Sequence, residues 1–216
     1  MKYILFDLDG TIIDTLEGLK NAVNHALISF NHPTRTRNEI RLFIGNGVRK
    51  LLQRSFPEGT SQEELDIGYE KFVNYYENNF IKESIPYNGM LELLTKLKEK
   101  YTLAVVSNKD DLFANELVEH YFPGVFKVIQ GTYFDKPKKP DPYIANLCLQ
   151  KLNAKAEECL LVGDTPVDVK TAINSNLNCI LVTYGFRTRD ELNELVKDVP
   201  MVDSISELEE KIKAIP

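Results

Sequence analysis

The chain beyond residue 86 alternates short apolar runs with amphipathic segments, and this alternation restricts the fold more than any other feature. Apolar runs rich in β-branched residues predict strands at residues 102–108, 126–131, 159–165 and 179–185. Helical periodicity covers residues 89–100, 111–122, 142–152 and 168–176. Nearly continuous apolar strands that alternate with helices are typical of a parallel sheet covered on both faces. A fifth apolar run, Tyr3–Phe6, is expected to join this α/β sheet.

Residues 16–82 follow a different pattern, because no segment among them has the features of a strand. Helical periodicity covers residues 16–30, 36–45, 46–56 and 61–80. Thr36 with Glu39, and Ser61 with Glu64, match the capping box, in which a serine or threonine precedes a glutamate by three residues. We therefore expect an all-helical insert between the first strand and the rest of the α/β unit.

Further signals mark the ends of this insert and of the chain. Asp14 is expected to cap the first insert helix, and Ser206 with Glu209 predicts the start of a last helix. Turn-forming residues at 86–89 mark the return to the α/β part. We expect one domain formed by residues 1–15 and 83–216, and a second formed by residues 16–82.

Size and charge exclude several classes of protein. A chain of 216 residues can form one core with a substantial insertion, or two small domains. The net charge of −6 argues against wholesale nucleic-acid binding. Cys148, Cys159 and Cys179 are few, odd in number and widely spaced, which favours buried, reduced thiols. With no leader before Tyr3 and no apolar run long enough to span a bilayer, we expect a cytoplasmic protein without a membrane partner.

The first predicted strand ends on two acidic residues one position apart, Asp7 and Asp9, followed by Gly10. If the chain stays extended past Phe6, both carboxylates point the same way. One of them can then bind a metal and attack while the other transfers a proton nearby. Gly10 lets the backbone approach a ligand closely, and its amide can face an anion.

Other polar residues follow other strands of the predicted sheet. Ser107 and Asn108 end one strand, Asp164 ends another, and Asp168 lies one turn later. Ligands bind at the carboxyl ends of strands in open α/β sheets, so these groups are expected to converge. Several carboxylates at one place require a compensating cation, and hard oxygen ligands suit Mg²⁺. Lys139, in a loop before a helix, can supply further countercharge.

Four motifs in this order resemble those of the haloacid dehalogenase superfamily, in its phosphatase branch. They are DLDGT at residues 7–11, SN at 107–108, KKPDP around Lys139, and GDTPVD at 163–168. The resemblance extends over essentially the whole chain. It implies an α/β fold with a Rossmann-like parallel sheet core and an inserted all-helical cap domain. It also implies an aspartate nucleophile.

The resemblance assigns roles to the acidic residues. Asp7 resembles the nucleophile that attacks phosphorus and becomes an aspartyl phosphate. Asp9 resembles the acid that protonates the leaving oxygen and later the base that activates water. Mg²⁺, the implied cofactor, would be held by Asp7, the backbone carbonyl of Asp9, and Asp164. Asp168 resembles a residue that contacts the metal through water or through another ligand.

The resemblance also implies a substrate site. Ser107 and the Asn108 amide would hold phosphoryl oxygens, beside the proposed anion contact at Gly10. Lys139 would neutralise charge on the nucleophile and the phosphoryl group. Residues 44–52 resemble the cap segment of phosphoglycolate phosphatases, and Arg49 within it could meet a substrate carboxylate. An exposed Arg49 without this role is an equally good interpretation.

The expected activity is Mg²⁺-dependent hydrolysis of a small phosphorylated metabolite, with 2-phosphoglycolate as the best specific candidate. The second acid, Asp9, argues against a dehalogenase, which is expected to lack it, and against a P-type pump, which has threonine there. Alternatives within the enzyme class are β-phosphoglucomutase-like phosphoryl transfer, a pyrophosphatase and a general sugar-phosphate phosphatase. A regulatory binding protein on a phosphatase scaffold is the non-enzyme alternative, and a monomer or a homodimer is expected.

Overall fold

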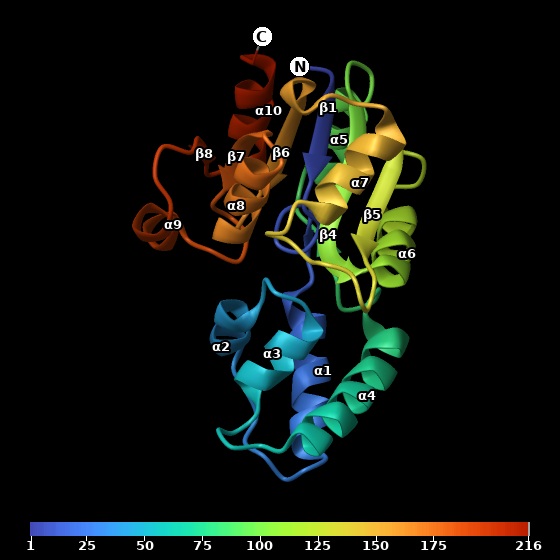
Figure 1. Cartoon of the computed structure of the whole chain (residues 1–216), viewed down its shortest axis with the longest axis vertical. Helices are drawn as coiled ribbons and strands as arrows, with labels where there is room; N and C mark the ends of the chain where they lie inside the picture. The colour runs from blue at the N-terminus through green and yellow to red at the C-terminus, as the bar shows by residue number, and fades with distance from the viewer. Residues whose placement is uncertain (216) are drawn as a thin grey trace. The chain divides into compact units, whose positions relative to one another are not determined.

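The structure is a computed structural model that describes residues 1–215. Six strands form a parallel sheet in the order β5-β4-β1-β6-β7-β8 (Figure 1). Their bounds are β1 Tyr3–Phe6, β4 Thr102–Asp110, β5 Val128–Thr132, β6 Cys159–Gly163, β7 Asn178–Val182 and β8 Met201–Val202. All five strands expected from the apolar runs are present, and the expected α/β fold with a parallel sheet is confirmed.

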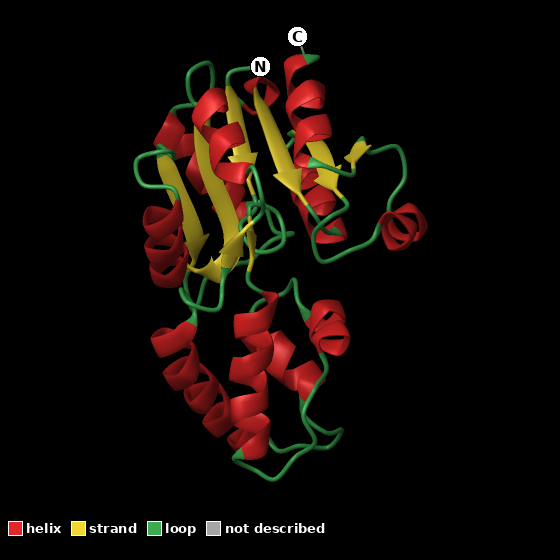
Figure 2. Ribbon diagram, turned by 180° about the vertical axis from the view of Figure 1, so that it is seen from behind, coloured by secondary structure: helices red, strands yellow, loops and turns green. Residues whose placement is uncertain are grey.

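Helices cover both faces of this sheet (Figures 1 and 2). They are α5 Met90–Leu97, α6 Asp111–Tyr121, α7 Tyr143–Leu152, α8 Pro166–Asn174 and α10 Ile205–Lys213. Helix α9 Arg189–Leu195 lies to the side of the sheet, beyond β8, and a short 3₁₀ turn spans Ala156–Glu158 (Figures 1 and 2). On one face, buried residues of α7 and α8 pack on alternate residues of the central strands, including Leu5, Val106 and Leu161. This alternation is the period of two that a strand imposes on its side chains.

The register of the central strands determines which residues meet at the carboxyl edge of the sheet. Phe6 of β1 is paired with Val105 of β4 and with Val162 of β6. The next residue, Asp7, donates its backbone N–H to the Val162 carbonyl at 2.8 Å. Residues that follow β1 and β6 therefore lie beside the last residues of β4 at one edge, which is where ligands bind in open parallel sheets.

The chain divides into two compact units, Met1–Ile13 with the segment from Pro86 on, and Asp14–Ile85. The breaks fall a few residues outside the expected insert of residues 16–82. The second unit holds four helices, α1 Leu16–Ile28, α2 Arg37–Phe43, α3 Val48–Ser55 and α4 Gln62–Asn79. Its core buries large side chains from each helix, namely Leu27, Ile40, Leu52, Phe72 and Tyr76. The segments at the two breaks, β2 Ile13–Asp14 and β3 Ile85–Pro86, pair as a two-stranded sheet.

Two helix starts in this second unit follow the predicted caps. The Thr36 and Glu39 side chains each accept a backbone N–H from the other residue, which completes a capping box at α2. Ser61 accepts the Glu64 N–H at α4. The cap position of α1 belongs to Thr15 rather than to the expected Asp14, which lies one residue earlier and accepts the Leu16 N–H at 3.0 Å.

The predicted start of the last helix is wrong by two residues. Helix α10 begins at Ile205, where Ser204 accepts the Glu207 N–H, so Ser206 lies inside the helix. Both serines precede a glutamate by three residues, and the capping pattern alone cannot separate them. Helix α9, which begins with a capping box between Thr188 and Glu191, was not predicted at all.

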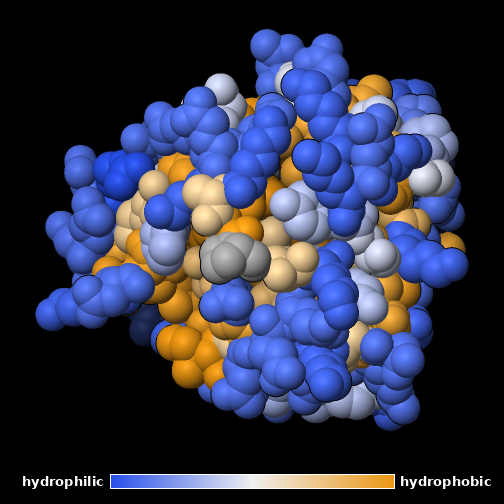
Figure 3. Space-filling model, turned by 90° about the horizontal axis from the view of Figure 1, so that it is seen from above, coloured by the Kyte–Doolittle hydropathy of each residue, from blue (hydrophilic) through white to orange (hydrophobic). Residues whose placement is uncertain are grey.

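The surface carries features expected of a chain rich in charged residues. On the face shown in Figure 3, hydrophilic side chains surround smaller apolar patches. Within residues 1–215, no helix combines the length and the apolar composition that crossing a membrane requires.

Candidate active site

Three carboxylates converge at the carboxyl edge of the sheet. Asp7 follows β1, Asp164 follows β6, and Asp168 lies in the first turn of α8. Each offers an oxygen within 4.8 Å of the oxygens of the other two. Asp164 and Asp168 are fully buried and Asp7 is 8% exposed. Segments far apart in the sequence thus meet in the way that parallel strand ends require.

Lys139 lies among these carboxylates. Its ammonium nitrogen is 2.9 Å from Asp7 Oδ1 and 2.7 Å from Asp168 Oδ1, and the residue is only 3% exposed. The second oxygen of Asp168 accepts hydrogen bonds from the N–H and the hydroxyl of Thr165, at 3.0 and 2.8 Å. Asp168 therefore caps helix α8 and fixes the head of Lys139 at the same time.

Burial governs the electrostatics of this cluster. Burial raises the pKa of Asp7 to about 7, although the charge of Lys139 opposes the shift. Burial, together with repulsion from Asp168 and Asp7, also raises the pKa of Asp164. Burial alone would lower the pKa of Lys139, but attraction to Asp168 and Asp7 outweighs it and the pKa is raised. The cluster therefore combines three carboxylates with one ammonium group, a set that a divalent cation would stabilise.

The surroundings of Asp164 fit a residue that holds a metal ion. The Phe186 N–H donates to Oδ2 at 2.6 Å and the Thr11 hydroxyl donates to Oδ1 at 3.2 Å, so the carboxylate is fixed in orientation. A Cβ on Gly10 would lie 2.3 Å from Oδ2, and one on Gly185 would lie 2.6 Å from the same atom. Hard carboxylate oxygens gathered in this way are the donors that Mg²⁺ prefers.

Asp9 forms an ion pair with a second lysine, Lys109. Its Oδ1 accepts a hydrogen bond from the Lys109 ammonium group at 3.0 Å. The two predicted catalytic carboxylates, Asp7 and Asp9, therefore pair with two different lysines. Strand β1 ends at Phe6, so the chain is not extended from Asp7 to Asp9 as supposed from the sequence.

Asn108 connects the second motif with the third. Its side-chain amide donates to the Lys139 carbonyl at 2.9 Å, and its oxygen accepts the Lys139 N–H at 2.7 Å. Ser107 is 1% exposed, and its hydroxyl accepts the Lys109 N–H at 3.2 Å. Both residues predicted to hold phosphoryl oxygens thus lie at the same sheet edge as the acidic cluster.

Comparison with known proteins agrees with this geometry. The haloacid dehalogenase-like hydrolase family matches residues 4–182, which is most of the chain. The chain belongs to this family. The family implies a divalent metal, and the cluster of Asp7, Asp164 and Asp168 has the donor atoms to hold one.

The proteins that this chain resembles within the family include phosphoglycolate phosphatases. The phosphoglycolate phosphatase of Vibrio parahaemolyticus is 31% identical over 98% of this chain and 96% of its own length. That of Colwellia psychrerythraea is 30% identical over 88% of each chain. The solved structure of a candidate phosphoglycolate phosphatase from Lactobacillus delbrueckii subsp. bulgaricus is 32% identical, covers 98% of both chains and superposes with a TM-score of 0.90. This hydrolase is therefore similar to phosphoglycolate phosphatases at about 30% identity.

The structure shows Gly10 in a tight turn, a role that differs from the predicted contact with an anion. Its φ of +85° allows the tight turn after Asp9, and its N–H donates to the Ile13 carbonyl at 2.9 Å. That N–H is already paired within the chain. The contribution of Gly10 that the structure shows is close packing on Asp164, and its contact with an anion stays a prediction.

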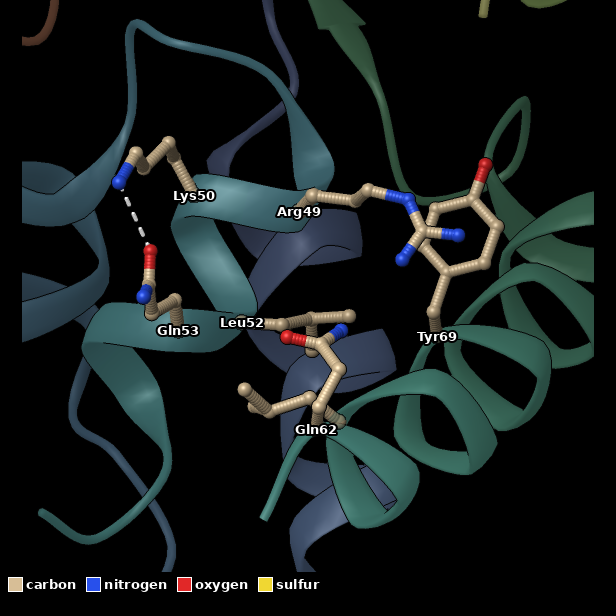
Figure 4. A pocket seen from close by; sticks show the side chains of 7 residues that line it. Arg49, Lys50, Leu52, Gln53, Gln62 and Tyr69 are labelled. Atoms are coloured by element: carbon tan, nitrogen blue, oxygen red, sulfur yellow. Dashed lines mark hydrogen bonds between the residues drawn. The ribbon is translucent and has the colours of Figure 1, made fainter. Parts of the chain in front are cut away.

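Arg49 lies in the helical unit, at a cavity of about 160 Å³ between α3 and α4. Its guanidinium group is 2.5 Å from Asp66 Oδ1. Figure 4 shows the same group over the Tyr69 ring, and its distance from the ring centre is 4.5 Å. The cavity is lined by Arg49, Lys50, Leu52, Gln53, Gln62, Leu65 and Tyr69. The role of Arg49 toward a substrate carboxylate stays a prediction.

Sequence reasoning missed Lys109, Thr11 and the Gly185–Phe186 pair. Lys109 directly follows the predicted Ser-Asn motif, so its position at a strand end was an available signal. Thr11 belongs to the first motif but was given no role. The Gly185–Phe186 pair follows β7, and a glycine after a strand of this sheet is a signal for close backbone approach.

Proposed function

We propose that this hydrolase cleaves a small phosphate monoester, with 2-phosphoglycolate as the best candidate, through an aspartyl phosphate on Asp7. One observation carries the proposal: Asp7, Asp164 and Asp168 converge, and the ammonium group of Lys139 pairs with Asp7 and Asp168. A nearly buried carboxylate beside a fixed cation is suited to attack an anionic phosphoryl group.

In the first step, a carboxylate oxygen of Asp7 attacks phosphorus and the bond between phosphorus and the ester oxygen breaks. Asp9 gives its proton to the departing ester oxygen, so the product leaves as an alcohol. Lys139 is 2.9 Å from the attacking carboxylate and offsets negative charge as the new bond forms. Ser107 and the Asn108 amide hold the phosphoryl oxygens.

In the second step, water attacks the phosphorus of the aspartyl phosphate. Asp9, now ionised, takes a proton from that water, and inorganic phosphate departs from Asp7. The enzyme returns to its starting state, because Asp9 regains the proton that it gave away. Asp168 holds Lys139 in place throughout, through the 2.7 Å ion pair.

The residues present fit a Mg²⁺ ion, which Asp7, Asp164 and the backbone carbonyl of Asp9 would hold. When bound, it would supply a charge that screens the anionic nucleophile from the anionic ester and favours in-line displacement. Asp168 already accepts hydrogen bonds from Lys139 and Thr165, which suits contact with the ion through water.

The choice of substrate is proposed from the relatives and from the helical unit. Curated relatives at 30 to 31% identity are phosphoglycolate phosphatases. We further propose that Arg49, which pairs with Asp66 in this structure, exchanges that partner for a second anionic group of the substrate, such as the carboxylate of phosphoglycolate. A cytoplasmic location and a monomeric or dimeric state remain predictions, to be tested by cell fractionation and by light scattering.

A substrate panel tests the proposal. Purified protein is incubated with Mg²⁺ and 2-phosphoglycolate, pyrophosphate, several sugar phosphates or β-glucose 1-phosphate, and released phosphate is measured. We expect the highest kcat/KM for 2-phosphoglycolate. Isomerisation of β-glucose 1-phosphate without phosphate release would show a mutase instead. No turnover of any ester, including an aryl phosphate, would point to a binding protein on a phosphatase scaffold.

A further inference from the structure

Lys109 is a nearly buried cation that the family motifs do not explain. It is 9% exposed, and its ammonium nitrogen is 3.0 Å from Asp9 Oδ1. The side chains of the two residues are 5% and 17% exposed, so both partners of this ion pair are largely removed from water. They lie 100 residues apart in the sequence. The fold therefore brings this lysine to the second acid of the first motif.

The surrounding contacts fix the direction of Lys109. Strand β4 changes register between Val106 and Asp110, and Lys109 lies in that irregular segment. Its backbone N–H donates to the Ser107 hydroxyl at 3.2 Å. A charge held this far from water is costly unless it is paired, so the Lys109 head and the Asp9 carboxylate restrict each other.

Lys139 cannot take over this task. Its ammonium group is already bound between Asp7 and Asp168. Each of the two proposed catalytic carboxylates therefore has a separate lysine, one beside the nucleophile and one beside the proton donor. This division indicates separate tasks for the two cations.

We propose that Lys109 is a positioning residue that holds the Asp9 carboxyl group in the orientation needed to protonate the leaving oxygen. The inference rests on the proposed phosphatase function, and it adds a residue that the reaction scheme above lacks. Lys109 exchanges no proton: the proton passes from Asp9 to the ester oxygen as the bond from that oxygen to phosphorus breaks. Without Lys109, Asp9 would rotate among several orientations, and protonation would become the limiting event.

The leaving group distinguishes this role from a structural one. A 4-nitrophenolate ion departs readily without a proton, whereas an alkoxide needs one. The value of kcat/KM covers the reaction up to the first irreversible step, which is release of the alcohol or phenol. We therefore compare kcat/KM for 4-nitrophenyl phosphate and 2-phosphoglycolate in wild type, Lys109→Met and Lys109→Arg.

In Lys109→Met, we expect kcat/KM for 2-phosphoglycolate to fall by about 100-fold, the low end of what general acid catalysis contributes. For the aryl ester, the loss should stay below about threefold, because proton donation contributes little to that bond cleavage. Lys109→Arg keeps the charge and should restore part of the loss. Lys136→Met, a change of an exposed lysine paired with Asp135, serves as the matched control and should leave both values unchanged.

A double variant gives a second test. If Lys109 acts through Asp9, adding Lys109→Met to Asp9→Asn should cause no further loss on the alkyl ester, because coupled residues are not additive. Equal losses on both esters, or a full additional loss in the double variant, would overturn the proposal. Should Lys109→Met fail to fold, as judged by circular dichroism, Lys109→Gln is used for the same comparison.

Failure of this inference can be distinguished from failure of the proposed function. If wild type hydrolyses both esters and Asp7→Asn hydrolyses neither, the phosphatase assignment stands whatever Lys109 does. If Asp9→Asn itself shows equal losses on the two esters, the role given to Asp9 is wrong. If Asp9→Asn loses more activity on the alkyl ester than on the aryl ester but Lys109→Met loses the same on both, only the positioning role of Lys109 is refuted.

Discussion

The side chain of Asn108 forms two hydrogen bonds with the backbone of Lys139, one in each direction, at 2.9 and 2.7 Å. This pair of bonds joins the end of β4 to the loop before α7. It fixes the backbone of the lysine whose head lies between Asp7 and Asp168. The side chain of Asn108 thus supports the site, in addition to the proposed contact between the Asn108 backbone amide and phosphoryl oxygens.

Asn108→Asp should destabilise the protein and slow turnover. The new carboxylate oxygen would face the Lys139 carbonyl in place of an N–H donor. Because Asn108 is partly buried, we expect a cost of about 1 kcal/mol, the low end for an unsatisfied polar group. We expect a lower free energy of unfolding and a fall of about tenfold in kcat. Asn78→Asp makes the same change on an exposed side chain of α4, where the expected cost is within about 0.5 kcal/mol. Similar effects of the two variants would show that the Asn108 bonds do not matter.

Gly185→Ala should disrupt the candidate metal site. The added Cβ would lie 2.2 Å from the Gly10 carbonyl oxygen and 2.5 Å from the Asp164 Cβ, so the backbone has to move. We expect weaker Mg²⁺ binding by calorimetry and a lower Tm. Gly59→Ala is the comparison, because nothing lies within 4 Å of its added Cβ and only its φ of +83° is strained. Unchanged Mg²⁺ affinity in Gly185→Ala would contradict the close packing described here.

Removal of metal should abolish activity and lower stability together. Three carboxylates share the site with one lysine, so we expect a divalent cation to bind the folded state and to stabilise it. At 100 times its Kd, such a ligand adds about 2.7 kcal/mol. We expect Mg²⁺ to raise the Tm of EDTA-treated protein, and Asp164→Asn to lose this increase. Asp135→Asn, an exposed change beside Lys136, should retain it. An equal response to Mg²⁺ in both variants would remove Asp164 from the metal site.

The thiols of the core should be unreactive in the native protein. Burial raises the pKa of Cys148 to about 12 and that of Cys159 to about 11. A raised pKa means less thiolate at pH 8 than an ordinary cysteine with a pKa of about 8.5 carries, by roughly a factor of a hundred or more. Iodoacetamide should therefore label both residues slowly at pH 8 and rapidly after unfolding in guanidinium chloride. Fast native labelling, read by peptide mass spectrometry, would contradict their burial.

Part of the site follows from the sequence for a simple reason. The carboxyl ends of parallel strands meet at one edge, so residues after β1, β4 and β6 were expected to converge. The structure brings Asp7, Asp164 and Asp168 together with Lys139, which the sequence placed in a loop before a helix. The contact of this loop lysine with Asp7 and Asp168 does not follow from strand ends alone, and the resemblance of the KKPDP motif was needed to assign Lys139 to the site.

Other features depend on geometry that a single sequence does not carry. The partner of Lys109 follows from a register change within β4, which leaves no mark in an apolar strand pattern. Gly185 contacts Asp164 because two loops pack tightly, and no local signal specifies that distance. The pairing of Arg49 with Asp66 depends on how α3 packs on α4, which helical periodicity alone does not determine.

The most direct measurement is the identity of the residue that carries phosphate during turnover. Wild type and Asp9→Asn are mixed with 4-nitrophenyl phosphate and Mg²⁺, quenched in acid and treated with borohydride, which reduces an acyl phosphate. Peptide mass spectrometry then locates the reduced residue. We predict modification at Asp7 alone, with more of it in Asp9→Asn because its hydrolysis is slowed. Modification at any other residue, or phosphate release by Asp7→Asn at a rate near that of wild type, would contradict the account.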